Sequence, residues 1–308
     1  MALCQHRHFN RLFVINNYTI VECNDCGMRK TSPVPSPEQI EDTYSEKFYS
    51  KKNSARFIPV AELLVKLFRF LRAFEIVHLY RPDKVLDVGC GRGLMLHYLK
   101  KYFKVNYVTG TQFSQTVIDY AKRNYDIELK KGELRENIDS IETELDFISF
   151  WHVLEHIDNV DHNIELCRCL LRDSGLLLIE VPNSESFSQR LLKTSWMGWD
   201  IPNHLSHFTP ASLANLLERH GFKIVGKNYF SLEYSIFTSI QSFLNWISGK
   251  HNLLYNSIFV DKKNKRFSIE VFAHLILVAV LMPWAFFINI VLYNNVKGEC
   301  IHYVAQKI

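Results

Sequence analysis

The sequence has little net charge and no basic stripe of the kind that nucleic-acid-binding proteins carry. Lysines and arginines number 36 against 32 aspartates and glutamates, which leaves a formal charge of +4 over 308 residues. No stretch interleaves aromatic and basic side chains in the way that single-stranded nucleic acids require. A nucleic-acid partner is therefore not expected.

The first ten residues also lack an apolar run, and the chain contains no internal repeat or low-complexity tract. Residues 1–10 therefore do not resemble a signal peptide. The cysteines number seven, an odd count, and Cys90, Cys167 and Cys169 lie in segments whose pattern indicates burial. Both observations favour a cytoplasmic protein in a reducing compartment over a secreted protein held by disulfides.

The middle of the chain carries the pattern of a parallel sheet. Between residues 55 and 230, apolar runs alternate with amphipathic helical runs, which is typical of strands joined by crossover helices. Strands are predicted at 84–88, 106–109, 128–129, 145–151, 176–181 and 222–229. A later helix has Thr209 as N-cap, Pro210 at its first position and His220-Gly221 at its end. The pattern predicts an α/β domain.

Residues 85–93 (Val-Leu-Asp-Val-Gly-Cys-Gly-Arg-Gly) lead an apolar strand into a glycine-rich turn. A helix is predicted over 94–103, and its N-terminus offers free N–H groups and a positive dipole. The alternative is an ordinary strand–helix turn. Leu94 stands where a dinucleotide fingerprint would place its third glycine. Asp87 would repel a pyrophosphate but attract an α-ammonium group, so a methyl-donor site is predicted.

These residues resemble a known family. The motif Asp87-x-Gly89-x-Gly91-x-Gly93 is similar to the first motif of class I S-adenosylmethionine-dependent methyltransferases. Residues 147–156, 170–183 and 202–209 resemble their fourth-strand motif, fifth-strand motif and a later loop, in a bacterial branch associated with surface-polysaccharide and lipid-linked biosynthesis. The resemblance implies a doubly wound, Rossmann-like, mostly parallel seven-stranded sheet that binds S-adenosylmethionine. It does not indicate the substrate.

The resemblance also implies cofactor contacts beyond the glycine loop. The second strand of such enzymes usually ends in an acidic residue that binds the ribose hydroxyls. Gln112 stands there, and it can hydrogen-bond a diol without the strength of a charged carboxylate. Glu133 falls where the family contacts adenine, with a solvated surface carboxylate as the alternative. The expected cofactor-binding residues are Asp87, Gly89, Cys90, Gly91, Gly93, Gln112, Glu133, Leu134 and Trp151.

Three histidines are the candidate catalytic residues. Methyl transfer is an in-line displacement, so positioning dominates, and a general base is needed only when the acceptor must lose a proton. His152 and His156 follow the fourth strand, at the carboxyl edge where ligands bind such sheets. Alternatively, the pair Glu155-His156 only orients the next loop. His204 lies in a loop with an aromatic-rich start, which suits a lid over the acceptor.

The N-terminal segment contains a metal-binding pattern. Cys23-Asn24-Asp25-Cys26-Gly27 has the spacing at which two thiolates bind one Zn²⁺. Cys4 and a histidine, His6 or His8, complete a Cys₃His set, for which we select Cys4, His8, Cys23 and Cys26. The resembling methyltransferases often begin with such a zinc ribbon before a proline-rich linker. The ion would be structural, and a metal-free relic is the alternative.

The chain becomes unusually apolar near its end. Residues 271–293 carry no formal charge and are long enough to cross a bilayer, and the basic cluster 262–266 suits anionic headgroups. Residues 299–307 resemble the family's last strand, which a single crossing would leave on the wrong side. Because Pro283 divides the run, we expect a helix–proline–helix hairpin in one leaflet, with 234–247 as a second interfacial helix. A buried or dimer-forming helical pair and a true span are the alternatives.

Together these patterns predict a cytoplasmic enzyme, peripheral or monotopic at the membrane surface, that methylates an O, N or C atom of a small glycan-related or lipid-linked acceptor. The alternatives are acyl-chain methylation of the cyclopropane-synthase type and a catalytically silent zinc- and membrane-binding scaffold. The oligomeric state is not indicated. The predicted regions are a zinc-ribbon-like module and linker (1–50), a methyltransferase domain (51–230), an apolar helical insertion (231–298) and a closing strand (299–308).

Overall fold

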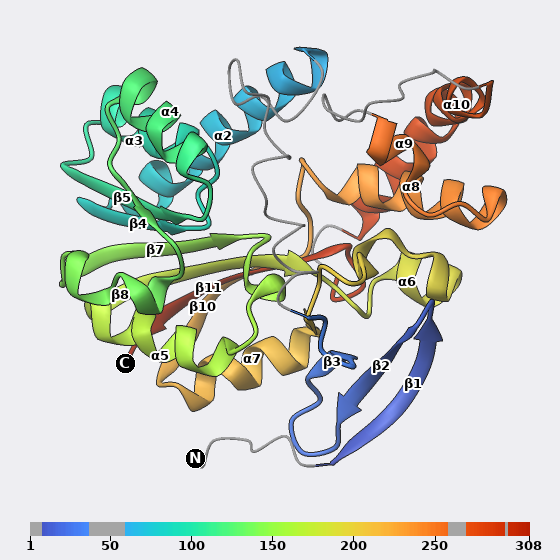
Figure 1. The fold of residues 1–308 in the computed structure, drawn as a ribbon, viewed down its shortest axis with the longest axis horizontal. Helices are drawn as coiled ribbons and strands as arrows, with labels where there is room; N and C mark the ends of the chain where they lie inside the picture. The colour runs from blue at the N-terminus through green and yellow to red at the C-terminus, as the bar shows by residue number, and fades with distance from the viewer. Residues whose placement is uncertain (1–7, 37–58, 258–268, 293–294) are drawn as a thin grey trace.

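A seven-stranded sheet lies at the centre of the computed structural model, which describes residues 8–36, 59–257, 269–292 and 295–308 (Figure 1). In spatial order its strands are β10 (Phe222–Asn228), β11 (Cys300–Lys307), β8 (Leu171–Pro182), β7 (Leu145–Trp151), β4 (Lys84–Val88), β5 (Tyr107–Gln112) and β6 (Leu129–Lys131). The pairs from β8 to β6 are parallel, whereas β11 is antiparallel to both of its neighbours. The predicted Rossmann-like, mainly parallel α/β fold is confirmed.

Helices cover both faces of this sheet (Figure 1). One face carries α2 (Pro59–Tyr80), α3 (Leu94–Phe103) and α4 (Gln115–Tyr125), and the other carries α5 (Val160–Leu170) and α7 (Pro210–Arg219). Alternate strand residues face the two layers, as the two-residue period of a strand requires. Leu86 and Ile148 belong to the core beneath α5 and α7, while Val85 and Phe147 belong to the core beneath α2 and α3.

Local sequence signals place several element boundaries correctly. β4, β7 and α3 span the predicted residues. At the start of α7, the Thr209 hydroxyl accepts the Ser212 N–H at 3.0 Å and the Ser212 hydroxyl accepts the Thr209 N–H at 2.9 Å. β8 begins at Leu171, five residues before the predicted start, because Leu171 pairs with Leu145 and Arg172 binds Asp146 at 2.5 Å. These contacts extend the strand through a polar segment.

A small second sheet contains β1 (Phe9–Ile15), β2 (Tyr18–Cys23), β3 (Arg29–Ser32) and β9 (Ser206–His207). The N-terminal strands thus pair with a loop of the large domain, since β3 and β9 are antiparallel neighbours. Arg29 donates to the Ser184 carbonyl at 2.7 Å and binds Glu185 at 3.3 Å. Met28 is buried in the main core. The N-terminal segment is therefore docked firmly on the large domain.

The apolar insertion contains α8 (Ser235–Ser248), α9 (Leu253–Ser257) and α10 (Ile269–Val291). The predicted helix–proline–helix hairpin is wrong, because α10 is one 23-residue helix with Pro283 inside it. Leu277 and Ala285, on either side of the proline, pack in the same apolar cluster as Leu244 of α8. This packing offsets the cost of a proline inside a helix, about 3 kcal/mol. The basic cluster 262–266 lies outside the described residues.

The remaining elements are short. They are α6 (Phe187–Leu192) and the 3₁₀ turns η2 (Leu134–Glu136), η3 (Ile138–Ser140), η4 (Leu154–His156), η5 (Lys193–Ser195) and η6 (Met197–Trp199). No disulfide joins the cysteines of the described ranges. Cys167 is buried as predicted, but Cys169 is exposed, because it lies on the outer face of α5.

Candidate active site

The glycine loop after β4 has a backbone that side chains would obstruct. Gly89, Gly91 and Gly93 have φ values of 68°, 57° and 68°, in the left-handed region that favours glycine. A Cβ atom added to Gly89 would lie 2.6 Å from Cγ2 of Val153. Thr111 fixes the loop from β5, because its hydroxyl accepts the Gly89 N–H at 3.2 Å and its carbonyl accepts the Cys90 N–H at 3.1 Å.

The three glycines have different surroundings. A Cβ atom added to Gly91 would meet no atom within 4 Å, and Gly91 lines the cavity described below. Gly93 is absent from the cavity lining, and a Cβ there would contact Ala121 and Ile127 at 3.7 Å. Gly91 thus leaves room for a ligand, whereas Gly93 serves the turn into α3. The sequence pattern did not separate these roles.

Asp87 is a buried carboxylate at the carboxyl end of β4. Its Oδ1 accepts the Ser149 hydroxyl at 2.8 Å. Burial raises the pKa of Asp87 to about 6, while the Ser149 hydrogen bond and the charges of Arg72 and Arg69 oppose this rise. A bound cation would remove part of this burial penalty. The site therefore suits a ligand with a positive group such as an α-ammonium.

The side chain of Gln112, at the end of β5, forms hydrogen bonds with three backbone groups. Its Oε1 accepts the N–H groups of Phe113 at 2.7 Å and Ser114 at 3.3 Å, and its Nε2 donates to the Gly91 carbonyl at 3.2 Å. An amide nitrogen carries two hydrogens, so one N–H remains for a ligand. Gln112 thus links the glycine loop to the next turn.

The predicted adenine-side residues lie in the turn after β6. Glu133 is the N-cap of η2 and pairs with Arg135 at 2.7 Å. Leu134 is buried, and both residues line the cavity. Cys90 lines it too, and burial raises the pKa of its thiol well above the usual range. The Cys90 side chain is therefore an uncharged wall of the site.

A cavity of about 1870 Å³ extends from the glycine loop to the α8–α10 region. At one end it is lined by Asp87, Gly89, Gly91 and Gln112, and at the other by Phe237, Ile240, Val278 and Met282. Trp151, His152, His156 and His204 line the space between them. Of the predicted cofactor and catalytic residues, Gly93 alone is missing from the lining.

His152 is held in an unusual backbone conformation between two acidic residues. Its φ is 54°, and its ring lies 3.7 Å from the Tyr234 ring, centroid to centroid. Its nitrogens lie 3.2 Å from Glu180 and 3.4 Å from Glu155. Burial opposes the imidazolium, but the contacts with Cys300 and the two carboxylates raise its pKa well above the usual range. His152 is therefore a buried cation, which orients and polarises groups better than it accepts a proton.

A charged network behind His152 was not predicted from the sequence. Glu180 accepts the Ser231 hydroxyl at 3.0 Å and lies 3.0 Å from His302 and 3.5 Å from Arg72. The Arg72 guanidinium also lies 4.2 Å from the centre of the Trp151 ring, a cation–π distance. The one signal in the sequence is a carboxylate, Glu180, inside the apolar strand β8.

His156 and His204 meet edge to face, with ring centroids 4.6 Å apart. The Nδ1 atoms bond to backbone oxygens, that of His156 to Asn203 at 3.0 Å and that of His204 to Gly198 at 2.9 Å. Burial, together with nearby His204, lowers the pKa of His156 to about 4. His156 is therefore neutral at pH 7, in contrast to His152.

The N-terminal cysteines lie in a tight turn between β2 and β3. The Gly27 N–H donates to the Cys23 carbonyl at 2.9 Å, and Gly27 has a φ of 71°. The Asn24 N–H donates to the His8 carbonyl at 3.0 Å, which places the His8 backbone beside the turn. Cys4 lies outside the described residues. Cys23 and Cys26 thus lie in one turn that packs against the main core, and neither of them lines the cavity.

Comparison with known proteins agrees with this geometry. A family model described as "Methyltransferase domain" matches residues 60–227. A ubiquinone biosynthesis O-methyltransferase of Coxiella burnetii is 31% identical over 107 residues, covering 32% of this chain and 43% of that protein. A protein of Mycolicibacterium smegmatis, named as a probable S-adenosylmethionine-dependent methyltransferase, is 25% identical over 154 residues, covering 49% and 56%. The chain thus spans about half the length of these curated relatives or less.

Among solved structures, a methyltransferase of Archaeoglobus fulgidus is similar with a TM-score of 0.47 and 21% identity, covering 80% of this chain and 99% of that one. The family model matches more than half of the 308 residues, and its span includes the glycine loop, Gln112 and His152. The glycine loop and the buried Asp87 fit S-adenosylmethionine, the cofactor of methyltransferases of this kind. When bound, it would supply an electrophilic methyl group. This chain belongs to the class I S-adenosylmethionine-dependent methyltransferases and is an enzyme.

Proposed function

We propose that the enzyme methylates an O, N or C atom of a small, lipid-linked or glycan-related acceptor at the cytoplasmic surface of a membrane. The proposal depends mainly on one observation, the cavity that joins the glycine loop to the apolar residues of α8 and α10. An amphipathic acceptor matches such a lining, with its polar group near His152 and its apolar part near Phe237 and Met282.

The charges beside the site favour a polar acceptor atom over an acyl chain. His152, Glu155, Arg72 and Trp151 line the middle of the cavity, next to the glycine loop. A hydrocarbon at that position would leave buried charges without compensation. An acceptor hydroxyl or amine would instead contact the His152 cation. Membership of a methyltransferase family favours an enzyme over the silent-scaffold alternative.

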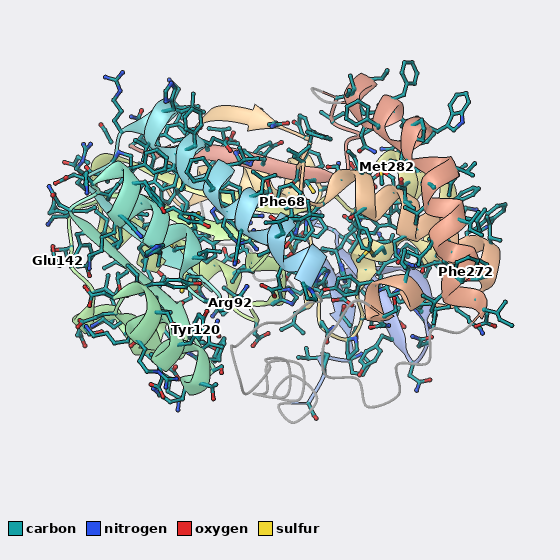
Figure 2. The ribbon with its side chains drawn as sticks, turned by 90° about the horizontal axis from the view of Figure 1, so that it is seen from above. Phe68, Arg92, Tyr120, Glu142, Phe272 and Met282 are labelled. Atoms are coloured by element: carbon teal, nitrogen blue, oxygen red, sulfur yellow. The ribbon has the colours of Figure 1, made fainter. Side chains whose placement is uncertain are left out.

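Membrane contact is supported by α10. This helix is apolar and long enough to cross a membrane. An 18-residue stretch of it has a mean hydropathy of 2.4, and only 11% of that stretch is buried. Phe272, Trp284 and Phe287 are more than 60% exposed. In Figure 2, Phe272 and Met282 lie on α10 at the opposite end of the molecule from Tyr120 and Glu142. An apolar face of this size is stabilised by a lipid surface.

Both ends of α10 are tied to the rest of the insertion, which favours an interfacial helix over a span. Near its start, Glu270 pairs with Lys250 at 2.6 Å. Near its end, the buried Asn289 donates to the Ser239 hydroxyl at 3.0 Å. A spanning helix would have to break these contacts and bury Asn289 in hydrocarbon.

A structural zinc ion at the N-terminal knuckle is a second part of the proposal. Cys23 and Cys26 have the spacing at which two thiolates bind one Zn²⁺, they lie in one turn, and the His8 backbone lies beside it. Elemental analysis should find about one zinc per chain that is lost in Cys23→Ser/Cys26→Ser. A folded wild-type protein without metal would contradict this site.

Labelled cofactor and membrane extracts test the main proposal. The purified enzyme is incubated with methyl-labelled S-adenosylmethionine and either total lipid extract or the water-soluble fraction of the same cells. We expect label in the organic phase, in a product that mild acid splits into a labelled polar part and an unlabelled chain. Label in water-soluble products alone would contradict a lipid-linked acceptor, and label that stays in the hydrocarbon would establish acyl-chain methylation.

A further inference from the structure

Apolar side chains form an exposed row along one side of α2. They recur at spacings of three or four residues, which places them next to one another on the helix surface: Leu63, Leu67, Phe70 and Phe74. Their exposed fractions are 68%, 49%, 37% and 43%, in that order. Single apolar side chains are common at protein surfaces, but a contiguous row of this kind marks an interaction surface. These four residues form the α2 ridge.

A groove of about 570 Å³ runs between the α2 ridge and α3. It is lined by Leu63, Leu64, Lys66, Leu67, Phe70, Tyr98 and Tyr102. Tyr102 is 55% exposed and meets Phe70 edge to face, with ring centroids 6.5 Å apart. The Lys101 ammonium group lies 5.4 Å from the centre of the Tyr102 ring. The groove thus combines aliphatic walls with exposed tyrosine and lysine side chains.

The charged side chains of α2 are divided between its two sides. Its acidic residues are held by other elements, since Glu62 pairs with Arg92 and Glu75 lies 3.6 Å from His302 of β11. Lys66, in contrast, is exposed at the groove. Helices that lie in the headgroup region of a membrane combine an apolar face with lysines and aromatic side chains, and the lysines contact anionic headgroups. The ridge and its groove have this composition.

The α2 ridge belongs to a helix on the same side of the molecule as α10. In Figure 1 both helices lie above the sheet, and Figure 2 looks onto this side, with Phe68 labelled on α2 and Met282 on α10. Both of these residues line the large cavity, as do Leu64 of α2 and Val278 of α10. A flat surface in contact with both helices would therefore lie across the part of the cavity that they line.

We propose that the α2 ridge is a second membrane-contacting surface, which binds an anionic lipid bilayer together with α10. The inference rests on the proposed function, because α10 supplies the other contact. A bilayer fits both surfaces because it is wide enough to reach two separate helices, accepts apolar side chains without a complementary shape and carries headgroups that attract lysines. In this orientation an amphipathic acceptor enters the cavity without leaving the membrane.

Sedimentation of the 308-residue chain with lipid vesicles tests the α2 ridge. The vesicles contain phosphatidylcholine and phosphatidylglycerol, and the variants are Leu63→Ser/Leu67→Ser, Trp284→Ser/Phe287→Ser and all four changes together. We expect the ridge variant to lower the partition coefficient at least about tenfold, because it removes apolar area that lipid would bury. The fourfold variant should lower it by about the product of the two separate effects, since the two surfaces do not touch the same side chains.

Leu79→Ser is the matched control. Leu79 is 62% exposed on α2 but lies off the ridge, because the chain from Leu63 to Leu79 turns the helix by roughly 160° beyond whole turns. This variant should sediment like the wild type. Lys66→Glu tests the same surface by its charge and should weaken binding roughly fivefold or more. It decides the question if the leucine variant does not fold.

Equal sedimentation of the ridge variant, Leu79→Ser and the wild type would overturn the proposal. A wild-type chain that dimerises without lipid, together with a monomeric ridge variant, would assign the ridge to a second copy of the chain instead. A large loss of stability in the ridge variant, with unchanged vesicle binding by Lys66→Glu, would show that the ridge is covered within the chain. If only Trp284→Ser/Phe287→Ser binds like the wild type, the α10 contact of the proposed function fails while the ridge remains.

Discussion

The two ends of the cavity are built in different ways. At the cofactor end, Asp87, Gly89 and Gly91 lie within five consecutive residues, and one neighbouring strand supplies Thr111 and Gln112. At the acceptor end, the lining comes from α2, η4, the loop before β9, α8 and α10. The cofactor, which the whole family shares, is thus bound by a local motif. The acceptor, which differs between enzymes, is bound by residues that only the whole fold brings together.

The largest expected effect is at the cofactor end. Gly89→Arg introduces a side chain where even a Cβ atom would lie 2.6 Å from Val153, so we expect binding of S-adenosylhomocysteine to weaken by about 100-fold or more, or roughly 2.7 kcal/mol. Calorimetric titration measures this, with Gly249→Arg at the exposed end of α8 as control. Wild-type protein that does not bind millimolar ligand would refute the cofactor assignment.

At the acceptor end, Glu180→Gln should lower the stability and the turnover of the enzyme but leave cofactor binding nearly unchanged. The change removes a charge that Arg72, His152 and His302 share, although Arg72 keeps Glu233 at 2.8 Å and His152 keeps Glu155 at 3.4 Å. Breaking such a network costs about 3–5 kcal/mol. Denaturant unfolding should show this loss, together with a lower kcat, while cofactor affinity changes less than about threefold. Glu142→Gln is the matched control, since Glu142 pairs with Lys84 at the exposed surface and should change stability by at most about 0.5 kcal/mol. Similar losses of stability and kcat in both variants would show that the buried network contributes no more than an exposed ion pair.

The exposed face of α10 should control membrane binding without affecting the fold. Trp284→Ser/Phe287→Ser removes two side chains that are 68% and 62% exposed, each worth roughly 1.5–3 kcal/mol if buried in lipid. Co-sedimentation with anionic vesicles should fall at least about tenfold, with little change in the melting temperature. Leu79→Ser, on the exposed face of α2, is the control. Unchanged sedimentation together with a large loss of stability would identify α10 as a buried or subunit-contacting helix.

Asp87 should give cofactor binding a pH dependence. Its pKa is raised to about 6 from an ordinary value of 3.8, so its contribution to folding stability is present below pH 3.8 and is lost as the pH rises through 6. A cationic ligand should therefore bind best above pH 6, and its Kd should rise about tenfold between pH 7 and pH 5. Titrations across this range measure the change. Asp87→Asn should bind weakly with a flat profile, and an equally steep profile in that variant would assign the dependence to another group.

Sequence patterns predicted most of what is local in this molecule. The glycine loop, the Thr209 cap and the strands at 84–88 and 145–151 follow from residues adjacent in the chain. The roles of Gly91 and Gly93 could not be separated, because the difference depends on Ala121 of α4 and on Ile127, which follow much later in the chain. The hairpin at Pro283 was wrong for a similar reason. Packing on α8 outweighs the local preference of proline to end a helix.

The acceptor end could not be predicted because its contacts join distant residues. The place of His152 after a strand predicts a site residue, but Glu180 and Tyr234, which contact its ring, lie far from it in the sequence. Its raised pKa follows from those partners, so the sequence alone could not distinguish a cationic His152 from a neutral His156. Charge state is a property of the folded environment.

The pairing of β3 with the loop before α7 also affects the order in which parts of the protein fold during synthesis. Thr31 donates to the His204 carbonyl at 2.7 Å across 173 residues of chain, and its N–H donates to the Leu205 carbonyl at 3.0 Å. At roughly 5–20 residues per second, a ribosome needs about 10–35 seconds to make that stretch. The β1–β2 hairpin can form early. In contrast, β3 cannot bond to the loop that carries His204 until the ribosome has made the intervening chain with its strands. During synthesis the acceptor pocket is thus completed after the cofactor pocket.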